Sequence, residues 1–316
     1  MADPLRRGQV QDLQARGLPL TADTALRVHV RTAKAAFPGG ALVRAEAADP
    51  SNRDGGAITI AHLIRKVFLV SDNPAFNWLL DFADPGYVED LMAEHGLESV
   101  RLRHHLREDP FAEAQACVAV QFDGPDGPCS LPLTQTWREP PAGPACPIGE
   151  GHVDAAGAVR AEPLDLAKKN RMSLSDMQEA LILLTREERP FGLTDEHRRL
   201  LTAAMAASPA TSANPRYAGY ADGWNKFFQR GLRKVLGRSV EIYNKLGQAY
   251  GFSLDTAYVV DRRTGVEFYL AACIYTNKNG ILNDGAYEYA AVGEPFLELL
   301  GERVAHHLLW KRRLLA

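Results

Sequence analysis

Two short polar motifs contain the residue types that could do chemistry in this chain. They are Ser71-Asp72-Asn73 and Lys245-Leu246-Gly247. A serine hydroxyl can pass on a proton, and a lysine ammonium can hold an anionic group. Taken singly, the first motif is more typical of a helix end followed by a turn, and the second of a solvated strand end. The order of the two motifs and the elements around them therefore decide their meaning.

The first motif follows a strongly periodic apolar segment. Thr59 is a good N-cap residue, and apolar residues recur at helical spacing over positions 60–70. Pro74 stands where a proline favours the first turn of a new helix. We therefore expect Ser71-Asp72-Asn73 to lie in the turn between two helices.

The second motif lies in a part of the chain that is rich in β-formers. The runs 240–245, 255–261 and 266–276 predict three strands, and Arg262-Arg263-Thr264-Gly265 predicts the short connection of a hairpin. A closing helix is predicted from Pro295, with acidic residues near its start and basic residues at its end. The lysine of the second motif is thus expected on a strand of an antiparallel sheet.

The remaining segments are mostly helical. Residues 103–159 are the exception, because they are rich in proline and glycine and show no helical period, so we interpret them as an insertion with short strands such as 117–122. Residues 17–56 are expected to be loose. Further helices are predicted over 5–16, 87–94, 194–206, 224–236 and from Ser173 onward.

Composition excludes several classes of function. The chain has 316 residues, of which 46% are hydrophobic and 24% charged, with a formal net charge of -3. This charge gives no basic field, so we expect no nucleic-acid partner. No uninterrupted apolar stretch is long enough to cross a bilayer, and the first seven residues lack the apolar run of a signal peptide.

No metal or cofactor is expected. The four cysteines contain no Cys-x-x-Cys pair, and no dinucleotide-binding or phosphate-binding glycine motif occurs. The adjacent pairs His104-His105 and His306-His307 would point apart on a helix or strand. Cys129 and Cys146 lie in a segment rich in proline and glycine, where they either form a disulfide in an exported protein or remain free thiols.

The two motifs in this context resemble those of class A β-lactamases and penicillin-binding proteins. The run Pro74 to Leu80 resembles the segment after their Ser-Asp-Asn loop, and Lys245-Leu246-Gly247 resembles their Lys-Thr-Gly strand. The runs 243–252 and 279–285 are similar to a less-studied branch of bacterial β-lactamase-like serine hydrolases. Leu246 departs from the usual threonine or serine, which removes a hydroxyl that would help to bind a substrate carboxylate.

The resemblance implies an α+β fold of the β-lactamase/transpeptidase type, in which an antiparallel sheet is flanked by helices and accompanied by a helical subdomain. The N-terminal strands of that fold would be missing. Residues 1–316 would form a single domain, with a helical subdomain at about 17–221 that contains the insertion. An α/β subdomain would comprise about 222–316 and the helix remnant 5–16.

The resemblance also implies the roles of five residues. Ser71 would pass a proton to the leaving nitrogen, Asn73 would bind the substrate amide, and Lys245 would face Ser71 across a cleft. Gly247 and Gln248 would contact the substrate, with the backbone N–H of Gln248 as half of the oxyanion hole. The first three are predicted to be catalytic and the last two substrate-binding.

The nucleophile that this family requires is absent from the sequence. No serine is followed by lysine at the third position, and Ser51, which alone precedes Ser71, has Asp54 there. The family nucleophile opens a core helix whose remainder would be 5–16. The general base is open as well, because Glu162-Pro163-Leu164-Asp165-Leu166 only partly matches the family's Glu-x-x-Leu-Asn loop, and we favour an ordinary acidic loop.

Three interpretations of function remain. The leading one is a fragment of an exported serine hydrolase that acts on β-lactams or peptide-like amides, periplasmic or extracellular in its intact parent and inactive here. The alternatives are a non-catalytic module that binds peptidoglycan-like peptides or β-lactams, and a mis-started gene product. The loss of N-terminal strands would also expose one edge of strand 266–276, so we expect self-association there.

Overall fold

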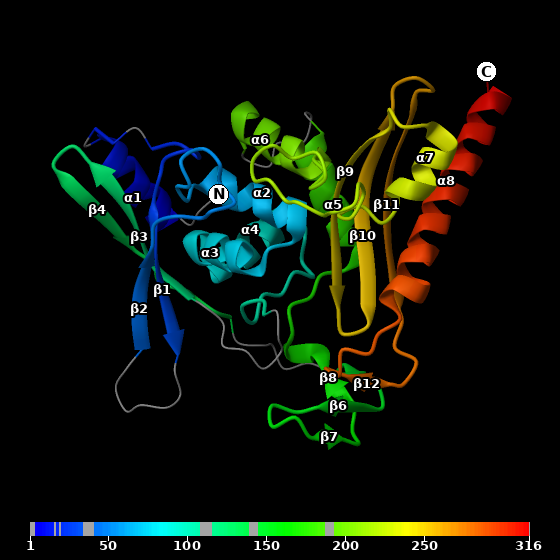
Figure 1. Cartoon of the computed structure of the whole chain (residues 1–316), viewed down its shortest axis with the longest axis horizontal. Coiled ribbons are helices and arrows are strands. Elements are labelled where there is room, and N and C mark those ends of the chain that lie inside the picture. The colour runs from blue at the N-terminus through cyan, green and yellow to red at the C-terminus, as the bar shows by residue number, and fades with distance from the viewer. Residues whose placement is uncertain are drawn as a thin grey trace. The chain divides into compact units, whose positions relative to one another are not determined.

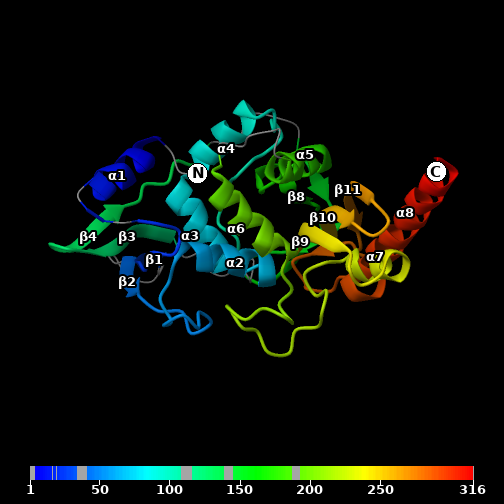
Figure 2. The same ribbon diagram turned by 90° about the horizontal axis from the view of Figure 1, so that it is seen from above.

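The computed structural model describes residues 4–15, 17–18, 20–33, 41–107, 116–138, 145–186 and 193–315. The chain forms two compact units, whose elements are labelled in Figure 1 and seen from above in Figure 2. Unit 1 comprises Met1–Pro141, Lys169–Arg171 and Ser212–Ala218. Unit 2 comprises Ala142–Lys168, Met172–Thr211 and Gly219–Ala316.

Unit 1 contains a four-stranded antiparallel sheet and four helices. The strand order is β2-β1-β3-β4. The strands are β1 (Arg27–Ala33), β2 (Ala41–Glu46), β3 (Ala116–Gly124) and β4 (Gly127–Pro132). The helices are α1 (Pro4–Ala15), α2 (Ile60–Val70), α3 (Asn73–Ala83) and α4 (Pro85–Glu94).

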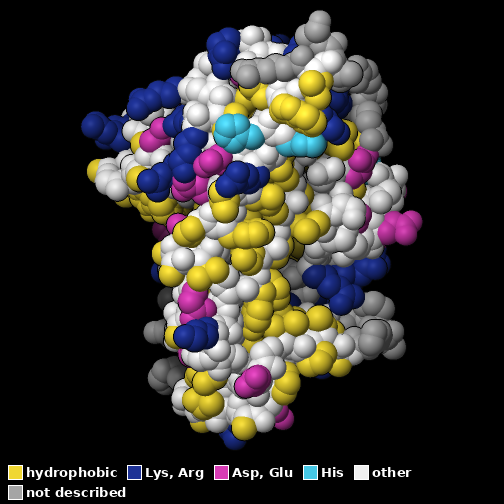
Figure 3. Space-filling model, turned by 90° about the vertical axis from the view of Figure 1, so that its right-hand side faces the viewer, with side chains coloured by type: hydrophobic (Ala, Val, Ile, Leu, Met, Phe, Trp, Pro, Cys, Tyr) yellow, Lys and Arg dark blue, Asp and Glu magenta, His cyan; other side chains and the backbone are white. Residues whose placement is uncertain are grey.

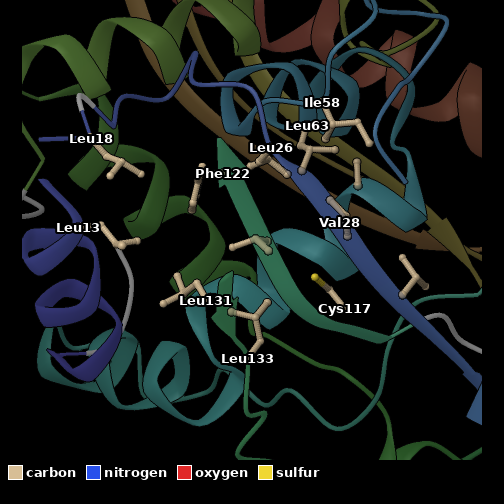
Figure 4. Close-up of a cluster of buried hydrophobic side chains, with 13 residues drawn as sticks. Leu13, Leu18, Leu26, Val28, Ile58, Leu63, Cys117, Phe122, Leu131 and Leu133 are labelled. Carbon is tan, nitrogen blue, oxygen red and sulfur yellow. The ribbon is translucent and has the colours of Figure 1, made fainter. Parts of the chain in front are cut away.

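The core of unit 1 lies between this sheet and its helices (Figure 4). Leu13 of α1, Val28 of β1 and Phe122 of β3 are buried together with Leu63 of α2. A buried hydrogen bond also ties α3 to the chain before β3, because His105 Nε2 lies 2.7 Å from Asp81 Oδ1. These contacts fix the two helices that flank the first motif.

Unit 2 is built on a three-stranded antiparallel sheet of order β11-β10-β9. Its strands are β9 (Glu241–Ala249), β10 (Phe252–Asp261) and β11 (Val266–Tyr275). Helices α5 (Leu174–Thr185) and α6 (Asp195–Ala206) pack against it, as do α7 (Gln229–Leu236) and α8 (Glu294–Leu315). The core between the sheet and the last two helices includes Phe228, Leu232, Ile242, Val259 and Leu297.

Helices α7 and α8 approach each other closely through glycine. A Cβ atom on Gly231 would lie 1.9 Å from the backbone oxygen of Glu298. Any larger residue would therefore force the two backbones apart. This close contact lets α8 pack tightly against α7 within unit 2, which carries the second motif.

Short strands complete unit 2. They are β5 (Pro147–Ile148), β6 (Gly151–Val153), β7 (Val159–Arg160), β8 (Leu164–Asp165) and β12 (Ile281–Leu282). Strand β12 pairs with β6 in parallel, and β5 pairs with β8. Leu166–Lys168 forms a 3-10 turn and Tyr289–Gly293 a π turn before α8. No helix in the described ranges is both long and apolar enough to cross a membrane.

The predicted fold class, α+β with antiparallel sheets flanked by helices, is confirmed. Thr59 caps α2, as predicted, and Ser173 and Thr194, the expected starts of two further helices, cap α5 and α6. Of the described N-terminal strands, β2 pairs with β1, and β1 also pairs with β3; neither pairs with β11. The subdomain limits predicted from the sequence stay a prediction.

Three local expectations differ from the structure. Residues 17–56 contain β1 and β2 rather than loose chain, and β3 and β4 of the supposed insertion belong to their sheet. Helix α1 packs in unit 1, whereas the sequence grouped 5–16 with the C-terminal strands. Helix α7 begins at Gln229, not Trp224, because residues 221–229 form consecutive hydrogen-bonded turns.

Candidate active site

Ser71-Asp72-Asn73 forms the junction between α2 and α3, as predicted. Ser71 ends α2 in the left-handed region, with φ 53° and ψ 43°. This conformation is uncommon for a residue other than glycine and needs support from its surroundings. The Asp72 carboxylate caps α3 by accepting the N–H of Ala75 at 2.8 Å, and Asn73 is the first residue of that helix.

A partly buried lysine holds this junction in place. Lys66 Nζ lies 2.8 Å from Asp49 Oδ2 and 3.0 Å from Asp72 Oδ2. Burial alone would lower the pKa of Lys66, but its hydrogen bond to Asp49 and the attraction of Asp72 raise that pKa above its ordinary value. Lys66 is therefore a permanent ammonium that links the motif to the loop around residue 49.

Asp49 is the centre of a small polar cluster. Its Oδ1 accepts the Ser51 hydroxyl at 2.7 Å, and its Oδ2 lies 3.3 Å from His62 Nε2. Burial would raise the pKa of Asp49, but the hydrogen bonds from Lys66 and Ser51 outweigh burial and hold it well below its ordinary value. Burial lowers the pKa of His62 despite the nearby carboxylate.

The types Ser51, His62 and Asp49 are those of a catalytic triad, but their arrangement is not. A triad needs the serine at one ring nitrogen and the carboxylate at the other. Here Ser51 Oγ, at 3.2 Å, and Asp49 both approach Nε2 of His62. The Ser51 hydroxyl already donates to Asp49, so the cluster stabilises the loop and does not activate Ser51 as a nucleophile.

Lys245 lies in the middle of β9. Strand register places it opposite Thr256 of β10, with Gly247 opposite Leu254. Lys245 Nζ donates to the carbonyl of Leu246 at 2.5 Å. Burial lowers the pKa of Lys245 to about 8, against the opposing attraction of Asp255. Near neutral pH this amine can therefore exchange a proton more readily than an ordinary lysine.

Gln248 occupies the exposed end of β9. It pairs with Ser253 across the ladder, and its side-chain Nε2 lies 3.2 Å from Ser253 Oγ and 3.3 Å from Glu294 Oε1. The ladder and these two contacts fix the strand just beyond Gly247. The backbone of Gln248 is thus held in a defined position, as an oxyanion donor must be.

A buried polar network supports β9 from its other face. Asn244 is next to Lys245 and points to the opposite side of the strand. Its Nδ2 donates to Asp255 Oδ1 at 2.8 Å, and its Oδ1 accepts from Lys226 Nζ at 2.7 Å. Lys226 also donates to the carbonyls of Met205 and Ile242. The network therefore joins the end of α6 to β9 and β10.

The charges in this network are displaced from their ordinary pKa values. Burial lowers the pKa of Lys226 to about 8, although Asp255 attracts its proton. Burial raises the pKa of Asp255 to about 6, although it accepts hydrogen bonds from Asn244 and from the backbone of Phe227. The site therefore holds β9 in register at the cost of burying two ionisable groups.

The sequence-predicted residues fall in two groups. Ser71 and Asn73 lie in unit 1, and Lys245, Gly247 and Gln248 lie in unit 2. The meeting of the two groups across one cleft stays a prediction. In the loop after Glu162, Asp165 accepts the backbone N–H groups of Cys146 and Ala167, an arrangement that fits an ordinary acidic loop.

Sequence reasoning missed the supporting residues Lys66, Asp49 and Lys226. The one signal for Lys66 was a charge inside the apolar period of α2. Asp49 lies in a segment without periodicity and Lys226 near the start of the predicted helix 224–236, and no pattern indicated the partners of either residue. In the described part of the chain the four cysteines are free thiols, and no three side chains of the metal-ligating types gather at one place.

Comparison with known proteins gives a family model that matches most of the chain. The model of the Beta-lactamase2 family, described as the beta-lactamase enzyme family, matches residues 41–291. No curated protein matches the chain. The assignment of the family therefore rests on the family model.

Several solved structures are similar at low identity. A β-lactamase from Sphaerobacter thermophilus is 13% identical, with 96% of this chain and 80% of that chain covered and a TM-score of 0.43. A β-lactamase from Francisella tularensis is 11% identical, with coverages of 96% and 98% and a TM-score of 0.45. The protein PBP-A is 13% identical, with 97% of both chains covered and a TM-score of 0.39.

The bridge made by Lys66 can be tested by Lys66→Met. Loss of the ammonium leaves the carboxylates of Asp49 and Asp72 without their common partner, so we expect the free energy of unfolding to fall by about 3 kcal/mol. The neighbouring Arg65→Met is the control, because Arg65 makes a distant 3.9 Å contact with an exposed aspartate. Urea denaturation measures both variants, and equal effects would contradict the bridge.

The same variant should change the response to acid. The lowered pKa of Asp49 means that the folded protein binds this proton more weakly than the unfolded chain. Its contribution is complete above the ordinary aspartate pKa of about 4 and is lost as the pH falls below it. Stability should therefore fall less steeply with acid in Lys66→Met than in the unchanged protein.

The buried network can be tested by Lys226→Met. The carbonyl oxygens of Met205 and Ile242 and Oδ1 of Asn244 lose their hydrogen-bond donor. We therefore expect the free energy of unfolding to fall by about 3 kcal/mol. Lys234→Met, which removes an exposed ammonium beside Glu298 and Glu302, should change stability little.

The dependence on pH gives a second check on this network. Because the pKa of Lys226 is lowered, the unfolded chain binds its proton more tightly, so stability should rise as the pH increases from about 8 to the ordinary lysine value near 10.4. The rise should be smaller in Lys226→Met. An identical pH profile would show that Lys226 is not buried as described.

Proposed function

Because the chain belongs to the beta-lactamase enzyme family, we propose that Ser71, Asn73 and Lys245 form the substrate-facing part of a serine-hydrolase site. The substrate class is a β-lactam or a peptide-like amide. We also propose that the 316 residues recognise such a compound without being acylated by it. The observation that carries this proposal is that both motifs are present in family order, while no serine has lysine at the third position after it.

Acyl transfer requires an activated nucleophile, a proton route and donors for the oxyanion. In the proposed site, Ser71 carries the proton to the leaving nitrogen and Asn73 binds the amide of the substrate. Lys245, whose pKa is lowered to about 8, holds the anionic group and exchanges protons with Ser71. The backbone N–H of Gln248 donates to the oxyanion.

The groups beside the first motif do not replace the missing nucleophile. Lys66 has a raised pKa and remains protonated, so it is a poor general base. Asp49 has a strongly lowered pKa and is a weak base. His62 is fully buried and faces Ser51 and Asp49 rather than solvent. These properties support recognition without acylation in the chain as it stands.

The second candidate is a dedicated binding module for peptidoglycan-like peptides or β-lactams. The absence of Ser-x-x-Lys favours it as much as it favours an inactive enzyme. In a dedicated module, binding would be the whole function and would tolerate Leu246 in place of a hydroxyl-bearing residue. Both candidates share the same recognition residues, so the same variants test them.

We expect no covalent adduct with a fluorescent penicillin and no hydrolysis of a chromogenic cephalosporin, because nothing in the sequence supplies the activated serine. Gel fluorescence after denaturation and absorbance measure these outcomes, with a class A β-lactamase as the positive control. A labelled band that survives denaturation would overturn the proposal.

Recognition is tested separately by titrating benzylpenicillin in a calorimeter. Asn73→Leu and Lys245→Met should each weaken binding at least tenfold, since each removes a hydrogen bond to the ligand, in the second case to a charged group. Val159→Lys, at an exposed apolar residue of unit 2, should leave binding unchanged. Binding that none of the three variants alters would contradict the proposed recognition residues.

A further inference from the structure

The outer edge of β11 is the most unusual surface of unit 2. Within the described ranges, β11 pairs with β10 along its whole length and forms the end of the sheet order β11-β10-β9. The edge is ten residues long, from Val266 to Tyr275. An edge of this length presents a row of backbone N–H and C=O groups that can pair with another strand.

This edge lacks the features that usually prevent such pairing. Natural edge strands are short, bulged, or interrupted by proline and lysine. The sequence of β11 contains neither of those residues, and its ladder with β10 continues without a register shift. Its single charge, Glu267, already contacts Arg186 and accepts a hydrogen bond from the Tyr258 hydroxyl. Little opposes the approach of a second strand.

The side chains of β11 are apolar on the face that meets α8. Phe268, Leu270, Ala272 and Ile274 pack against the core of unit 2 but are incompletely buried. Cys273 and Tyr275, on the other face, are exposed. The strand therefore offers apolar side chains together with its open backbone edge.

Helix α8, which contacts β11, extends this surface. Phe296, Leu299, Trp310 and Leu314 are between 44% and 65% exposed, and helical spacing places them on one side of α8. Leu297 and Ala305, on the opposite side, are fully buried. Figure 3 shows hydrophobic side chains running down the middle of this face of the molecule. These residues form two pairs, Phe296 with Leu299 and Trp310 with Leu314, and the exposed Arg303 and His307 lie between the pairs on the same side. Single exposed apolar residues are common, but several on one side of a helix favour an interaction surface.

We propose that the β11 edge and the exposed side of α8 form an interface between two copies of this chain. A strand edge is completed by another strand edge, and β11 itself supplies one in a two-fold antiparallel pair. In that arrangement the two copies of Glu267 lie near opposite ends of the paired strands. Like charges are therefore kept apart, and the apolar centres of the two strands meet.

The area of this surface is sufficient for a weak dimer. A ten-residue strand is about 34 Å long, and the row from Phe296 to Leu314 extends about 27 Å along the helix axis. With a width of about 10 Å for each element, the two copies would cover roughly 1,200 Å² in total. This value lies at the lower end of stable interfaces, so the dimer should form at micromolar concentrations.

Cysteine cross-linking tests the geometry. In a variant with Cys129→Ser and Cys146→Ser, the remaining cysteines are the buried Cys117 and the exposed Cys273. Pairing around the middle of β11 brings the two copies of Ala271 close together. With Cys273→Ser and Ala271→Cys added to this variant, a short bis-maleimide should therefore give a covalent dimer on a denaturing gel. A matched variant with Cys273→Ser and Val159→Cys should give monomer.

Surface variants and light scattering test the affinity. Cys273→Lys and Leu299→Glu should each weaken the dimer at least tenfold, whereas Val159→Lys should leave it unchanged. Amides along Val266–Tyr275 should become slower to exchange as the protein concentration rises. Two results would overturn the proposal: a dimer that neither variant weakens, or a monomer at all concentrations with strongly protected β11 amides, which would mean that another segment covers the edge.

Discussion

A lysine ammonium that is removed from water must be surrounded by oxygen atoms, and each candidate motif depends on one such lysine. Lys66 joins Asp49 to Asp72 and so supports the left-handed turn at Ser71. Lys226 joins the end of α6 to β9 through two carbonyls and Asn244, directly beside Lys245. In both units, the residues that would contact a substrate are held in place by neighbouring residues that would not contact it themselves.

This division explains how a site can be kept without its nucleophile. The supporting contacts are made by buried or half-buried groups whose pKa values are shifted by burial and by their partners. They do not require the serine that a β-lactam would acylate. The turn at Ser71 and the strand at Lys245 therefore keep their local geometry in a chain whose sequence contains no Ser-x-x-Lys.

The sequence predicted those elements that begin or end at a residue with a strong local preference, such as a capping residue, a proline or a turn glycine. Thr59 indicated the start of α2, and Pro74 indicated the start of α3. The runs of β-forming residues on either side of Gly265 indicated β10 and β11. It did not predict β1 or β2, because the alternation of Val28 and Val30 with polar residues in β1 is short, and one of the two partners of β1, strand β3, lies in a distant part of the chain. The candidate site could be predicted only in part. Its motif residues are contiguous in sequence, whereas supporting residues such as Asp49 are identified only by tertiary contacts.

The most direct test of this account is whether Ser71 and Lys245 meet. Ser71→Cys and Lys245→Cys, combined in a chain with Cys129→Ser, Cys146→Ser and Cys273→Ser, can be treated with a short bis-maleimide and mapped by peptide mass spectrometry. The account predicts rapid cross-linking within one chain, and none when Val159→Cys replaces Lys245→Cys. If both engineered thiols react with a simple maleimide but never with each other, Ser71 and Lys245 do not share a site.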